Sequence, residues 1–109
     1  MSEQDKQATR IRAMLSGDVT EVRLLMQHRM ETGRRKGPSG DPFPAHYIAE
    51  FKVLHKDRVV LEGDFSTAIS TNPYLSFTFS GGELGDEISV EWRDNLGESR
   101  RDTGTIGAV

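Results

Sequence analysis

Three histidines are the side chains in this sequence best suited to chemistry near neutral pH. His28, His46 and His55 do not fall three to five residues apart, the spacing that places two metal ligands on one element, and no HExxH run is present. A metal site would therefore require convergence of the histidines in the folded chain. The sequence favours a simpler role: we expect His46 to donate to a loop carbonyl and His55 to face water.

Nucleophilic chemistry has no candidate residues. The chain contains no cysteine, and none of its serines lies in a GxSxG elbow. Ser39-Gly40 and Ser80-Gly81 are typical of turns, and the adjacent acids Asp86 and Glu87 are typical of a solvated surface. Without a set of nucleophile, base and orienting group, we predict a protein that is not an enzyme and that uses no cofactor or metal.

A basic segment at residues 28–36 is the strongest local signal. Four cations oppose Glu31 there, a net charge of +3 in a chain of net charge −3. Such a segment attracts an anion or an acidic partner, or it is a solvated loop. Met30 favours contact, because a thioether gains nothing from water, and aromatic side chains add apolar surface nearby. The candidate residues facing a partner or a bound anion are His28, Arg29, Met30, Arg34, Arg35, Lys36, Phe43 and Tyr74.

Alternation of apolar and polar residues with period two dominates the sequence and predicts strands. A long polar loop with several glycines and prolines separates the second strand from the third. The last strand is polar and suits a sheet edge. The seven expected strands are Thr9–Leu15, Thr20–Met26, Tyr47–His55, Val59–Phe65, Leu75–Phe79, Glu87–Arg93 and Glu98–Thr103.

Seven short strands with one apolar face each predict an all-β protein, an immunoglobulin-like antiparallel β-sandwich. A small closed barrel is the alternative. The length of 109 residues allows one domain. We expect a flexible N-terminus at residues 1–8, a single domain at 9–103 and a C-terminal tail at 104–109.

Composition excludes several classes of partner. A net charge of −3 is unsuited to sequence-independent binding of nucleic acid. No apolar run approaches the roughly 18 residues that would predict a transmembrane helix. The N-terminal segment MSEQDKQATR has no apolar core of a secretory signal. We expect neither nucleic acid nor a membrane as a partner.

Several specific segments, in this order, resemble the SoxZ family, the small subunit of the SoxYZ sulfur carrier of bacterial thiosulfate oxidation. They are the HRMETGRRK run at 28–36, PAHYI at 44–48, NPYLSF at 72–77, Gly85-Asp86, VEW at 90–92, and DNLG at 94–97. The resemblance extends over residues 9–102.

The resemblance implies an immunoglobulin-like sandwich without catalytic residues, in a heterodimer with a SoxY-like subunit. That partner carries sulfur intermediates on a cysteine at the tip of a glycine-rich C-terminal arm. Other sulfur-oxidation enzymes dock transiently on the carrier, which is periplasmic. We therefore expect this chain to be exported together with a signal-bearing partner. A basic loop suits such a carrier, because the thiosulfonate adducts are anionic.

Two other interpretations compete with this one. The chain could be another immunoglobulin-like interaction module without sulfur chemistry, such as an adhesin or a pilus-chaperone domain. It could also be a small metal-dependent enzyme that uses the histidines, which analysis for bound metal would test.

Overall fold

The computed structural model describes residues 9–28, 30–69 and 71–108. It is all-β, with seven strands and no helix in the described ranges. No segment among these residues is a helix long and apolar enough to cross a membrane. The strands are β1 (Arg10–Ser16), β2 (Val19–Leu25), β3 (Ile48–His55), β4 (Arg58–Asp64), β5 (Tyr74–Ser80), β6 (Glu87–Asp94) and β7 (Ser99–Ala108).

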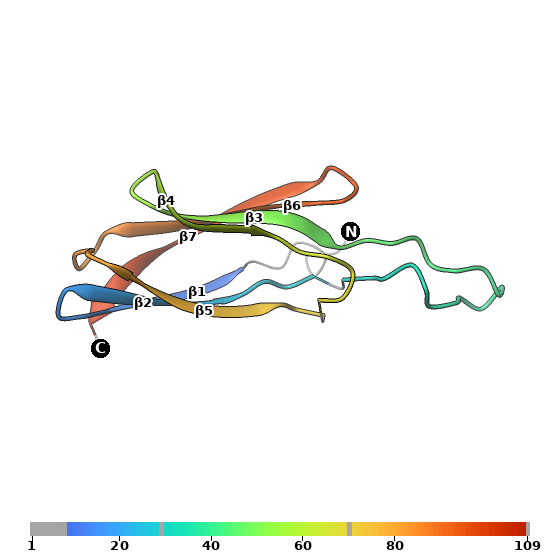
Figure 1. Ribbon diagram of the computed structural model, residues 1–109, viewed down its shortest axis with the longest axis horizontal. Coiled ribbons are helices and arrows are strands. Elements are labelled where there is room, and N and C mark those ends of the chain that lie inside the picture. Colours follow the sequence, from blue (N-terminus) through green and yellow to red (C-terminus); the bar gives the residue numbers. More distant parts are fainter. Residues whose placement is uncertain (1–8, 29, 70, 109) are drawn as a thin grey trace.

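The strands form one seven-stranded sheet with the order β4-β3-β6-β7-β1-β2-β5. It folds over into two layers, one with β3, β4 and β6 and the other with β1, β2 and β5 (Figure 1). All pairs are antiparallel except β1 and β7, which are parallel from Ala13 opposite Ile106 to Leu15 opposite Ala108. The prediction of an immunoglobulin-like all-β fold is confirmed.

The last strand differs from the expectation. A polar edge strand at 98–103 followed by a tail was predicted, but β7 continues to Ala108 and lies inside the sheet. Its residues 99–105 pair with β6 and its residues 106–108 pair with β1. The polar side chains there neutralise one another: Arg100 Nε donates to Asp102 at 2.8 Å, and Asp102 also accepts the N–H of Thr9. A polar strand can therefore occupy an interior position.

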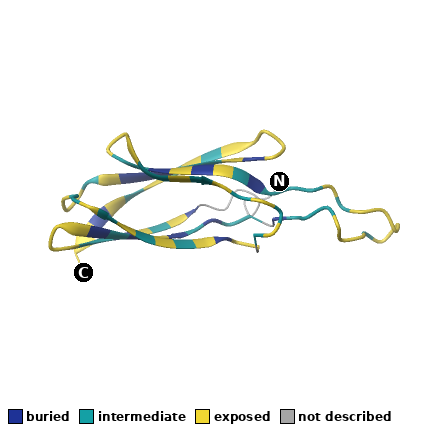
Figure 2. Ribbon diagram, in the orientation of Figure 1, coloured by how far each residue is buried: buried dark blue, intermediate teal, exposed yellow. Residues whose placement is uncertain are grey.

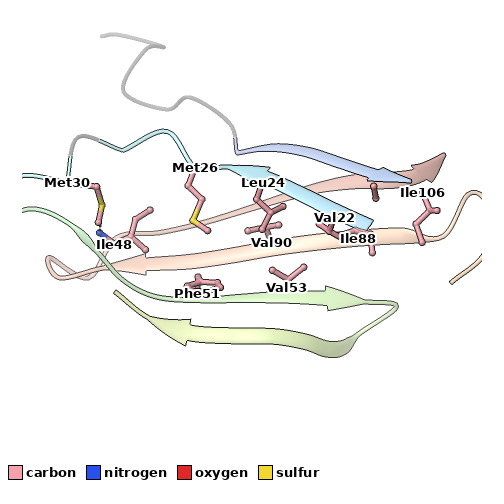
Figure 3. Packing of buried hydrophobic residues seen from close by; sticks show 11 residues of the cluster. Val22, Leu24, Met26, Met30, Ile48, Phe51, Val53, Ile88, Val90 and Ile106 are labelled. Carbon is pink, nitrogen blue, oxygen red and sulfur yellow. Dashed lines mark hydrogen bonds between the residues drawn. The ribbon is translucent and has the colours of Figure 1, made fainter. Parts of the chain in front are cut away.

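The core lies between the two layers and runs along the sandwich (Figure 3). Exposed and buried residues alternate along most strands, as period two requires (Figure 2). Ile48 breaks the expected alternation. Strict alternation back from Phe51 and Val53 would turn Tyr47 and Ala49 toward the core, but a register shift between Ile48 and Glu50 turns Ile48 inward, where it is 0% exposed.

Candidate functional site

The chain between β2 and β3 forms an extended hairpin that projects from one end of the sandwich (Figure 1). We call residues 31–46 the basic hairpin. Its two legs are joined by an antiparallel bridge between Glu31 and His46, and further out by one between Lys36 and Pro42. At its base the backbones of Glu31 and His46 exchange hydrogen bonds of 2.6 and 2.9 Å. The expected polar loop is thus an ordered projection.

Arg35 stabilises the basic hairpin from within. Its guanidinium donates to both carboxylate oxygens of Glu31, at 3.2 and 2.7 Å, and its Cζ lies 4.2 Å from the centre of the Phe43 ring. The hydrogen bond that Arg35 donates to Glu31 and the charge of that carboxylate raise the pKa of Arg35. Arg34 and Lys36 are exposed and form no ion pair with any residue in the described ranges. Among the described residues of the basic hairpin, the positive charge available to a partner is therefore that of Arg34 and Lys36.

A buried polar cluster lies where the basic hairpin joins the sandwich. It comprises His28 from the segment after β2, His46 from the second leg of the hairpin, and Asp94 from the end of β6. His46 Nε2 lies 2.8 Å from Asp94 Oδ2, and His28 Nε2 lies 3.7 Å from the same oxygen. The side chains of His28, His46 and Asp94 are 6%, 29% and 1% exposed. We call these three residues the His–Asp–His cluster.

The proton on His28 is fixed by its neighbour. The N–H of Met30 donates to His28 Nδ1 at 3.0 Å, so Nδ1 is an acceptor and the neutral ring carries its proton on Nε2. That proton faces the Asp94 carboxylate. The edge of the Trp92 indole packs against His28, with ring centres 5.3 Å apart. His28 is thus positioned by hydrogen bonding on one side and by an aromatic contact on the other.

Asp94 organises the turn that follows β6. Its Oδ1 accepts the N–H groups of Leu96 at 3.0 Å and Glu98 at 2.9 Å, which leaves Oδ2 for the histidines. Burial raises the pKa of Asp94, but the hydrogen bonds from His46 and from the two backbone N–H groups outweigh it, and the net pKa is lowered. The cluster therefore contains a buried carboxylate in its ionised form.

His55 forms a separate pair at the far end of β3. Its Nε2 lies 2.8 Å from Asp86 Oδ2, and both side chains are 16% exposed. The expectation that His55 faces water, and that Asp86 is merely solvated, was wrong. The pairing of β3 with β6 brings the end of one strand beside the start of the other. This hydrogen bond is the largest cause of the lowered pKa of Asp86.

The structure separates the predicted contact residues into buried and exposed groups. Met30 and the His28 ring are buried, so their expected place on a partner-facing surface is corrected. Met30 is 3% exposed, and its sulfur accepts the N–H of Ile48 (Figure 3). Arg29 lies outside the described residues. The predicted residues that are accessible are Arg34, Arg35, Lys36 and Tyr74, while Phe43 is half-buried.

Sequence reasoning missed Asp94 as a site residue and assigned His46 to a loop carbonyl. Asp94-Asn95-Leu96-Gly97 has the composition of a turn, and an aspartate that begins a turn often accepts local N–H groups. Its second oxygen meets the histidines only through tertiary structure. Asn95 reinforces the junction, since it accepts the N–H of Tyr47 and donates to the carbonyl of Ala45.

Comparison with known proteins adds the decisive observation. The family model of the sulphur oxidation protein SoxZ matches residues 9–105, nearly the whole chain. The chain belongs to the SoxZ family. This assigns it to sulfur oxidation and to a family of Sox complex subunits. The segments in which the sequence resembles this family include residues 28–36, 44–48 and 94–97, and these three segments contain all members of the His–Asp–His cluster.

Solved structures share the fold of this SoxZ family member at low identity. A hypothetical protein from Pyrococcus horikoshii OT3 is 16% identical, with a TM-score of 0.60, over 91% of this chain and 87% of the other. A variant of superoxide reductase (neelaredoxin) from Archaeoglobus fulgidus, in the reduced form, is 16% identical, with a TM-score of 0.60, over 98% and 93%. No curated protein sequence matches the chain. The structural likenesses show the fold alone.

Proposed function

We propose that this chain is the non-catalytic subunit of a heterodimeric sulfur carrier in thiosulfate oxidation. A SoxY-like partner carries the sulfur intermediates on its cysteine arm, and this subunit shields them and helps the pathway enzymes to dock. The proposal rests above all on the match to the SoxZ family over residues 9–105. The resemblance to that family also supports a periplasmic location, which fractionation of cells would test.

The basic hairpin is the part of this chain that we assign to the anionic adduct or to an acidic docking surface. It projects from the sandwich, and much of its outer part is exposed (Figure 2). Arg34 and Lys36 are exposed cations of this hairpin. A sulfur adduct ending in sulfonate is anionic, and unpaired cations attract it over distances of about 8–10 Å at physiological salt. Arg35 serves a different purpose, because Glu31 already neutralises it.

Two experiments test the proposal. Co-expression with the SoxY-like partner should give a 1:1 complex that survives gel filtration, and a chain that stays monomeric beside the partner would contradict the assignment. In the reconstituted pathway, Arg34→Ala with Lys36→Ala should lower turnover by about 3- to 10-fold at low ionic strength, with a smaller effect at high salt.

A matched control separates a local effect from loss of net charge. Arg10→Ala with Arg12→Ala removes the same charge from two exposed positions on β1, in the sandwich itself. We expect this variant to keep the turnover of the wild type. If both double variants lost the same turnover, the loss would be due to net charge and not to the position of the cations. If the hairpin variant kept the turnover of the wild type, the basic hairpin would have no role in recognition.

A further inference from the structure

The His–Asp–His cluster presents three potential ligand atoms to one point. We propose that it binds a divalent transition-metal ion through the Nε2 atoms of His28 and His46 and the Oδ2 atom of Asp94. These ligand atoms all lie within 4.8 Å of one another. A tetrahedral ion with bonds of about 2.0–2.1 Å separates its ligands by roughly 3.3 Å. The two distances to Asp94 Oδ2, 2.8 and 3.7 Å, fall on either side of that value.

The surroundings of the cluster suit an ion of intermediate softness with open coordination positions. Two imidazoles and one carboxylate favour zinc, iron(II), cobalt(II) or nickel(II) over calcium or magnesium. Asp94 is held by two backbone N–H groups on its other oxygen, which is the kind of outer support that orients a ligating carboxylate. The ring of His28 is buried, at 6% exposure, whereas the ring of His46, at 29% exposure, is partly open to solvent.

Metal binding has one definite consequence for His28. Coordination needs the lone pair of Nε2, but the Met30 N–H bond places the ring proton on Nε2. The proton must move to Nδ1, so the ring stays neutral and no net proton is released. Two N–H groups cannot face each other at 3.0 Å, so the Met30 N–H must turn away. Met30 has φ of 50°, a region uncommon for residues with a side chain. The bound ion and the Met30–His28 hydrogen bond are thus mutually exclusive.

The test uses the untagged, full-length chain after removal of metal. Titration with Co²⁺, followed by visible absorption, should show one site per chain and the bands of a four- or five-coordinate ion, and Zn²⁺ should displace the Co²⁺. His46→Gln and Asp94→Asn should each weaken binding at least about 100-fold, since they remove a ligand and not merely an outer partner. Circular dichroism checks that each variant is folded.

The third histidine provides a matched control. His55 and Asp86 lie at the same 2.8 Å as His46 and Asp94, but belong to no group of three ligands within the described residues. His55→Gln should leave the affinity unchanged within about twofold. If Asp94→Asn fails to fold, His46→Gln carries the test, because that ring is partly exposed.

Nitrogen NMR of His28 supplies a second measurement. The metal-free chain should show a proton on Nε2, and addition of Zn²⁺ should move it to Nδ1 and shift the Met30 amide. Absence of stoichiometric binding, equal weakening by His55→Gln, or an unchanged His28 tautomer in the loaded protein would each overturn the proposal. The result does not depend on the proposed carrier function, because neither the partner nor the pathway enters the measurement.

Discussion

Replacement of Met30 by alanine tests whether this residue belongs to the core, as the structure shows, or to a contact surface, as its polar sequence neighbours indicate. Met30 is 3% exposed, and truncation of a buried methionine costs about 2–5 kcal/mol. Its sulfur also accepts the N–H of Ile48 at 3.3 Å, and loss of that acceptor adds about 1 kcal/mol. We expect the free energy of unfolding to fall by about 3–6 kcal/mol.

Urea denaturation measures this loss directly. For a domain of this size the slope is about 1–3 kcal/mol per molar urea, so the midpoint should fall by roughly 1–6 M. Met30→Leu keeps most of the volume and removes only the sulfur, and should cost about 1 kcal/mol. Tyr74→Ala, at an exposed position (59%), should change stability by less than about 0.5 kcal/mol. If Met30→Ala were as mild as Tyr74→Ala, the assignment of Met30 to the core would be refuted.

Two further substitutions test the polar contacts. Asp94→Ala removes the acceptor of two backbone N–H groups and should lower the free energy of unfolding by about 3 kcal/mol. Asp94→Asn keeps an acceptor oxygen and should cost about half of that. Equal losses in urea denaturation would show that Asp94 does not stabilise the turn through these two hydrogen bonds. The pKa of Asp86 is lowered chiefly by the hydrogen bond from His55. The ionised carboxylate therefore stabilises the fold fully at pH values above the ordinary aspartate pKa of about 3.9. This stabilisation is lost as the pH falls through the lowered pKa of Asp86 in the folded chain. His55→Gln should raise the pKa of Asp86 in a carboxyl NMR titration, and an unchanged value would argue against this cause.

The strands were predictable because each carries its own signal. Alternation in Val22, Leu24 and Met26 requires one buried face, and the structure leaves all three at 0% exposure. The polar seventh strand was misjudged because the sequence does not reveal that Arg100 and Asp102 satisfy each other. A polar pattern therefore looks like an edge or a tail until its partners are known.

The His–Asp–His cluster was not predictable from spacing. His28 and His46 are separated by the whole basic hairpin, and they meet only because the bridge between Glu31 and His46 closes it at the base. Asp94 reaches them through the pairing of β3 with β6, in which Ile48 lies opposite Asp94. Local patterns report local structure, whereas this cluster depends on two tertiary contacts at once.

The position of β7 has a consequence for how the chain folds during synthesis. β7 joins the two layers of the sheet, and its last residues pair with β1 at the opposite end of the sequence. A ribosome makes the chain from its N-terminus, so β1 cannot pair with β7 until the six strands that precede β7 have been made. Contacts between such distant segments also close slowly. Hairpins such as β1–β2 and β3–β4 can therefore form first, but the two layers become one sheet only when β7 emerges.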